Sequence, residues 1–205
     1  PKSEAVHKLV NGQLTVTDST WEGIISTKGA SHDTWLEALD VMGHMALLRN
    51  IRNLLQHDVK PDQFVEKLVN GAERGKQLPF RYFSAYRSVM TDAPPVVLDA
   101  IEESMMKSMN NLPAFKGRVM SLCDNSGSAR GAATSSMGTM QIATIANLTA
   151  ILTAMQSDEG YIGVFGDRLE TMPVRKRSSV FDTLEKAEKI GNGIGGSTEN
   201  GIWLF

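Results

Sequence analysis

Residues 124–128, Asp-Asn-Ser-Gly-Ser, carry the side chains whose types and spacing are best suited to chemistry. They directly follow the apolar run 119–123, which has the character of a buried β-strand. A strand that ends in such a loop presents the Asp124 carboxylate and the Ser126 and Ser128 hydroxyls at the carboxyl edge of a sheet, where open α/β folds bind ligands. Hard oxygen donors suit Mg²⁺ or Mn²⁺. The pattern predicts a divalent-metal site, and an ordinary turn or helix N-cap is the alternative.

A second loop, residues 191–200, is rich in glycine and carries the hydroxyls of Ser197 and Thr198. Glycine permits positive φ and close approach of the backbone to a ligand. This loop is therefore able to bring a further donor, Thr198 or its neighbour Ser197, to the same metal. The loop has no lysine and no G-x-x-x-x-G-K-[ST] motif, which argues against a nucleotide phosphate loop. A flexible glycine turn between two elements remains the alternative.

The elements around these loops alternate between strand and helix. After the strand at 119–123, apolar residues recur at spacings of three and four over residues 142–155, which predicts a helix. A second apolar run at 161–165 then predicts a parallel strand and a right-handed βαβ unit. A charged helix is expected over about 178–190, with Gly191 as its C-cap.

The amino-terminal half has the pattern of helix after helix, as in an α-solenoid. One amphipathic helix is expected over about 34–56 and another over about 95–110. Between them, Pro61 is a first-turn proline and Gly71 is the expected end of its helix.

The Asp124-x-Ser126-x-Ser128 pattern after a strand, with the later GGST sequence at 195–198, resembles the metal-ion-dependent adhesion site of von Willebrand factor A domains. The upstream segments at 21–25, 45–50 and 78–82, followed by a helix that leads into 118–120, are similar in order to the Ro ribonucleoprotein (TROVE) family. The bacterial members of that family resemble this chain most.

The resemblance implies an α plus α/β fold. Residues 1–115 would form a helical HEAT-like repeat segment, the C-terminal part of the TROVE ring, and residues 116–205 the first half of a Rossmann-like von Willebrand A domain. It implies Asp124, Ser126, Ser128 and Thr198 as ligands of Mg²⁺ or Mn²⁺. The distal acidic ligand of such a site would fall beyond Phe205.

The function implied by the resemblance is that of a non-enzymatic RNA-binding scaffold. Its partners would be small non-coding RNAs of the Y type and the ends of misfolded RNAs, with a role in RNA maturation or decay and an exoribonuclease as protein partner. The alternative is an A-domain module that binds a protein carboxylate through its metal and has no RNA role.

Composition and charge limit the remaining possibilities. The net charge is −2, so the chain has no overall positive field, although basic residues cluster at Arg74, Lys76, Arg81 and Arg87 and again at 175–177. Such clusters either contact a nucleic-acid backbone or lie on a solvated face.

No nucleophile elbow or H-E-x-x-H motif supports catalysis. The single cysteine, Cys123, fits a reducing, cytoplasmic location. No apolar run approaches the ~20 residues of a membrane span, and neither a membrane nor a DNA partner is expected.

Overall fold

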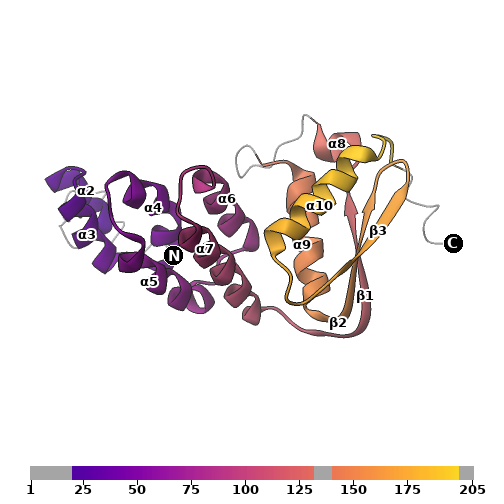
Figure 1. The fold of residues 1–205 in the computed structure, drawn as a ribbon, viewed down its shortest axis with the longest axis horizontal. Helices are drawn as coiled ribbons and strands as arrows, with labels where there is room; N and C mark the ends of the chain where they lie inside the picture. The colour runs from indigo at the N-terminus through magenta and orange to yellow at the C-terminus, as the bar shows by residue number, and fades with distance from the viewer. Residues whose placement is uncertain (1–19, 132–139, 199–205) are drawn as a thin grey trace, which may run out of the picture.

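The computed structural model describes residues 20–131 and 140–198, which form a helical part followed by a part built on a small β-sheet (Figure 1). The two parts lie end to end along the long axis of the molecule. The helical part consists of α2 (Trp21–Lys28), α3 (His32–Val41), α4 (His44–Gln56), α5 (Pro61–Gly75), α6 (Pro79–Val89), α7 (Pro95–Ser108) and the short 3-10 helix η1 (Met109–Asn111).

Local sequence signals explain where these helices begin. The side chains of Thr20 and Ser31 cap α2 and α3 by accepting hydrogen bonds from backbone N–H groups in the first turn. Proline occupies the first position of α5, α6 and α7, where its missing N–H costs no helical hydrogen bond. The apolar stripe of each helix packs into one core, in which Leu47, Phe64 and Ile101 are almost completely buried.

Two boundaries in the helical part differ from the sequence prediction. The expected helix over 34–56 is two helices, because Met42 adopts an extended conformation and α4 restarts after Gly43. Gly71 does not end α5, which continues to Gly75 and stops where Lys76 takes a left-handed conformation with φ 46°. The apolar stripe alone does not reveal either boundary, since it continues through the break and past Gly71.

The second part contains β1 (Phe115–Asp124), α8 (Gly127–Arg130), α9 (Ile142–Met155), β2 (Ser157–Phe165), β3 (Leu169–Val174) and α10 (Val180–Gly193). The strand order is β1-β2-β3, with β1 parallel to β2 and Asp124 opposite Phe165. The predicted parallel pairing of two strands joined through a helix is therefore confirmed. β3 pairs antiparallel with β2 and was not predicted, because its short run of alternating polar residues includes Pro173, which suits an edge strand.

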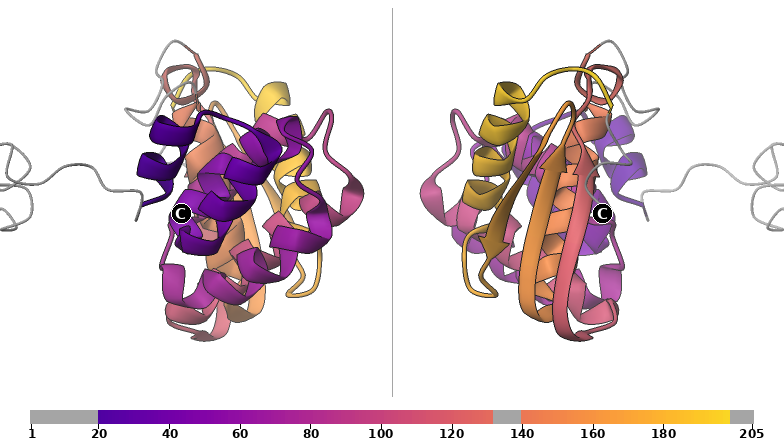
Figure 2. Two further views of the ribbon diagram at one scale, coloured as in Figure 1. Left: turned by 90° about the vertical axis from the view of Figure 1, so that its left-hand side faces the viewer. Right: turned by 90° about the vertical axis from the view of Figure 1, so that its right-hand side faces the viewer.

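Helices α9 and α10 cover one face of the sheet (Figure 2). Leu148 and Ile151 of α9 are buried beneath the strands, whereas Met120 and Leu122 of β1 lie on the other face and are about half exposed. Helix α10 was expected to end at Gly191, but it extends to Gly193. Gly191 is buried inside the helix rather than serving as its cap.

The two parts share a packed junction. The Phe181 ring of α10 contacts Tyr86 of α6, with ring centroids 4.1 Å apart, and also Phe83, at 5.6 Å. The carboxylate of Glu102 in α7 accepts hydrogen bonds from the Ser179 hydroxyl and the Val180 N–H at the start of α10. An acidic group at that end complements the helix dipole.

The fold is thus an α-rich segment followed by an α/β segment. A HEAT-like repeat, a von Willebrand A domain and a division at 115/116 stay predictions. Within residues 20–131 and 140–198, no helix combines the length and apolar character needed to cross a membrane.

Candidate metal centre and its supporting network

The predicted Asp-x-Ser-x-Ser loop leaves the carboxyl end of β1 as expected. One Asp124 carboxylate oxygen accepts a hydrogen bond of 2.8 Å from the Ser126 N–H, which orients the side chain. The Ser126 and Ser128 hydroxyl oxygens lie 3.3 Å apart. Adjacent ligands of an octahedral Mg²⁺, at about 2.1 Å from the ion, would be about 3.0 Å apart. The two hydroxyls are therefore spaced almost as neighbouring ligands of one ion require.

The Asp124 carboxylate has no basic partner among the residues that the structure describes. The nearby Arg130 pairs instead with Glu188, at 3.3 Å. The predicted anionic ligand is thus not neutralised by an arginine. This charge arrangement suits a cation.

The glycine-rich loop meets the first loop through its backbone. The Gly127 N–H donates to the Gly196 carbonyl at 2.8 Å, and a Cβ atom on Gly127 would lie only 3.2 Å from that oxygen. The Asp167 carboxylate holds the glycine loop from the β2–β3 turn by accepting the Gly195 N–H at 2.7 Å. Two segments about seventy residues apart therefore meet through their backbones, and a metal shared between their side chains stays a prediction.

The hydroxyl groups of the glycine-rich loop form no hydrogen bonds with the predicted ligands of the first loop among the residues that the structure describes. Ser197 and Thr198 are both exposed. Within the described ranges, neither side chain forms a hydrogen bond with Asp124, Ser126 or Ser128. The choice of Thr198 or Ser197 as a ligand stays a prediction.

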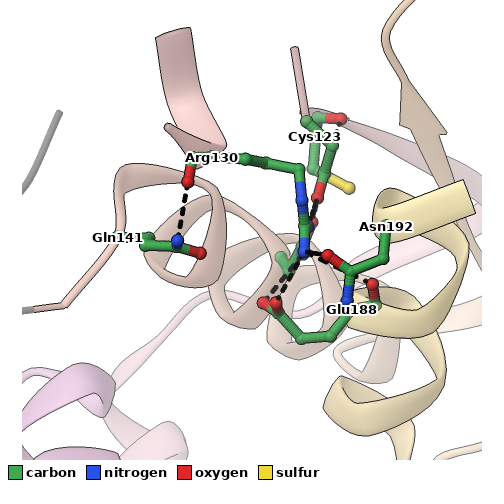
Figure 3. A network of polar contacts seen from close by, with 7 residues as sticks. Cys123, Arg130, Gln141, Glu188 and Asn192 are labelled. Carbon is green, nitrogen blue, oxygen red and sulfur yellow. Dashed lines mark hydrogen bonds and ion pairs between the residues drawn. The ribbon is translucent and has the colours of Figure 1, made fainter. Parts of the chain in front are cut away.

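A buried polar network, centred on Asn125, links the first loop to α9 and α10 (Figure 3). Asn125 and Asn147 exchange two amide hydrogen bonds of 2.7 and 3.0 Å. Arg130 donates to the Asn125 side-chain oxygen at 2.7 Å and also contacts Glu188 and Asn192. The Asn147 amide donates to the other Glu188 oxygen at 3.2 Å. Asn125 lies between the two predicted ligands Asp124 and Ser126, so this network fixes the loop.

Sequence reasoning missed this network. Its hydrogen-bonded pairs are separated by up to 62 residues and show no common spacing. Gly191 gave the one usable signal, because a Cβ atom there would lie 2.3 Å from both the Arg130 guanidinium and the Asn125 oxygen. The glycine that was interpreted as a helix cap is instead required for close packing.

The cysteine beside the predicted metal loop is not activated as a nucleophile. Burial, with the charges of Glu188 and Asp124 adding to it, raises the pKa of the neighbouring Cys123 thiol to about 12. The thiol therefore stays protonated at neutral pH. Across residues 20–131 and 140–198, no cluster of three or more His, Cys, Asp or Glu side chains is placed to hold a metal. A metal at this edge would depend on serine hydroxyls beside the single carboxylate, which is the predicted donor set.

Comparison with known families shows the family of this chain. Residues 14–162 match the model of the TROVE domain. The chain belongs to the TROVE-domain family. The resemblance inferred from the sequence is thereby confirmed, although the match does not test the von Willebrand A assignment.

Solved structures agree with this membership at the level of the fold. The TROVE-family chain is similar to the crystal structure of the Deinococcus radiodurans Ro (RSR) protein, with a TM-score of 0.57 and 17% sequence identity. The match covers 97% of this chain and 45% of that chain, so this chain spans less than half of the Deinococcus protein. A search of the curated proteins finds no match.

Proposed function

We propose that this chain is part of a non-enzymatic RNA-binding scaffold of a ribonucleoprotein. Its ligands would be small non-coding RNAs of the Y type and the ends of misfolded RNAs, and an exoribonuclease would link it to RNA processing or decay in the cytoplasm. The TROVE match over residues 14–162 is the observation that carries the proposal. The similarity of fold to a Ro protein supports it.

The proposal is tested by filter binding of a labelled structured RNA at low and at physiological salt. Clustered basic side chains that neutralise phosphates release counterions, so retention should be tight at low salt and fall steeply as salt rises. Absence of retention even at low salt would refute the RNA-binding role.

We further propose that the loop at the end of β1 binds Mg²⁺ or Mn²⁺. Asp124, Ser126 and Ser128 would hold the ion, with Thr198 as a further ligand directly or through water. A bound ion would supply an open coordination position for the carboxylate of a partner. The orientation of the Asp124 carboxylate and the 3.3 Å separation of the two serine hydroxyls support this assignment.

Titration calorimetry with Mg²⁺ or Mn²⁺ tests the metal site. Asp124→Ala should abolish the heat of binding seen in the unsubstituted chain. Asp62→Ala is the matched control, because Asp62 is an exposed carboxylate in the first turn of α5, in the helical part of the molecule (Figure 1). Equal heats for the unsubstituted chain and Asp124→Ala would sink the assignment.

A second candidate function is a metal-dependent protein-binding module without an RNA role. The convergence of the two loops through the Gly127–Gly196 hydrogen bond favours it. It predicts no RNA retention at low salt together with metal binding that depends on Asp124. Retention of RNA with steep salt dependence would favour the scaffold.

A further inference from the structure

Helices α4 and α6 lie side by side in the helical part and enclose a pocket of about 290 Å³ between them. One wall comes from residues spaced three and four apart on α4, including Met45, Arg49 and Arg52. The other comes from Gln77, just before α6, and from Arg81 and Ser84 on it. Such spacing places each set on a single helix face, so the two rows face each other across the pocket.

Positive charge dominates this pocket. Arg49, Arg52 and Arg81 line it, and no acidic residue among those that the structure describes does. The Arg81 guanidinium also lies 5.4 Å from the centre of the Phe80 ring. In the described part of the chain, neither Arg49 nor Arg52 forms an ion pair or a side-chain hydrogen bond. Like charges repel when they share one site, and an anion bound between them would remove that repulsion.

The chemistry of the lining indicates which anion fits. A guanidinium presents a planar fork of N–H donors that matches phosphate oxygens, often in pairs. Asn53, Gln77 and Ser84 add neutral polar groups to the same walls. The volume lies at the lower end of the range for ligand pockets, which suits one phosphate and its adjoining sugar better than a large cofactor.

We propose that this arginine pocket, lined by Arg49, Arg52 and Arg81, binds a backbone phosphate of single-stranded RNA. The inference rests on the proposed RNA-binding function and names the place where the helical part would hold its ligand. A single strand is favoured because its flexible backbone can lower one phosphate into a concave pocket. Paired phosphates are fixed on the outside of a duplex.

The other basic cluster is different and provides a matched control. Arg175, Lys176 and Arg177 are exposed between β3 and α10, where Lys176 lies 3.8 Å from Asp158. None of these three residues lines the arginine pocket. Substitution of Arg175 and Arg177 therefore removes the same number of arginines without altering that pocket.

The test measures retention of a labelled single-stranded RNA of about 12 nucleotides over a series of salt concentrations. It compares the unsubstituted chain with Arg49→Gln/Arg52→Gln and with Arg175→Gln/Arg177→Gln. Each lost phosphate contact on a single strand should reduce the slope of log K against log salt by about 0.7. Loss of two contacts should flatten the slope by about 1.4 and weaken binding roughly tenfold at about 0.15 M salt. The control variant should bind like the unsubstituted chain.

The outcomes distinguish a failure of the pocket assignment from a failure of the proposed RNA-binding function. If the unsubstituted chain does not retain RNA, both the proposed function and the pocket assignment fail. If it does, an unchanged slope for Arg49→Gln/Arg52→Gln overturns the pocket alone. Equal weakening of both double variants would show a diffuse charge effect and would likewise overturn it. Thermal unfolding checks that the variants fold, which is expected because Arg49 and Arg52 are exposed and glutamine is a good helix former.

Discussion

The ion pair of Arg130 and Glu188 should stabilise the fold far more than a surface pair does. The two side chains are only 14% and 25% exposed, and Arg130 also donates to the side-chain oxygens of Asn125 and Asn192. Arg130→Met would leave the Glu188 carboxylate partly buried without its cation. Removal of one partner from a fully buried pair costs about 3–5 kcal/mol, so this partly exposed pair should cost about 2–3 kcal/mol.

A double-mutant cycle in urea measures the pairwise contribution. The cycle combines Arg130→Met with Glu188→Gln and should give a coupling energy of about 1.5–3 kcal/mol. The control cycle uses Lys28→Met and Glu37→Gln, because that pair is 2.6 Å apart but nearly half exposed. Its coupling energy should be about 0.2–1 kcal/mol. Equal coupling in the two cycles would refute the view that burial makes the Arg130 network structural.

Three further predictions concern packing and titration. Gly191→Ala should lower the free energy of unfolding, measured by urea titration, by about 1–3 kcal/mol, because the new Cβ would overlap Asn125. Gly193→Ala is the control: its Cβ would meet nothing within 4 Å, so its stability should not change. The Cys123 thiol, with its pKa raised to about 12, should react with a thiol reagent at about pH 8 only after unfolding; fast labelling of the native protein would contradict this. Burial lowers the pKa of His44 below its ordinary value of 6.5. The stability that the neutral side chain contributes is therefore present above pH 6.5 and is lost as the pH falls through the lowered pKa. His44→Gln should reduce the loss of stability at acid pH, measured by urea unfolding.

The elements of this fold that could be predicted are those whose pattern lies within a short stretch of sequence. The apolar run before Asp124 and the helical spacing over 142–155 identified the βαβ unit, because each pattern lies within such a stretch. The run is apolar although Met120 and Leu122, on one face of β1, are about half exposed. β3 was missed because a short antiparallel edge strand needs little burial. The break after Met42 was missed because the apolar face continues across it.

The candidate site shows the same division between local and distant contacts. Asp124, Ser126 and Ser128 could be placed from the sequence because one tight turn brings them together. Asn147 and Glu188, which fix that turn, could not, since each contributes a single polar side chain from a different helix. The arginine pocket was missed for a similar reason: Arg81 was grouped with its neighbours along the chain, although Arg49 and Arg52 face it from α4.

The network behind Asn125 implies that the protein, rather than an ion, sets the shape of the candidate metal loop. Asp124→Asn keeps an oxygen that can accept the Ser126 N–H but removes the charge, so it should abolish metal binding with little loss of stability. Arg130→Met should lower stability and also weaken metal binding, because the loop loses the contact that holds Asn125. Calorimetry on both variants, beside urea unfolding, separates the two roles. Unchanged metal affinity in Arg130→Met would show that the loop keeps its shape without the network.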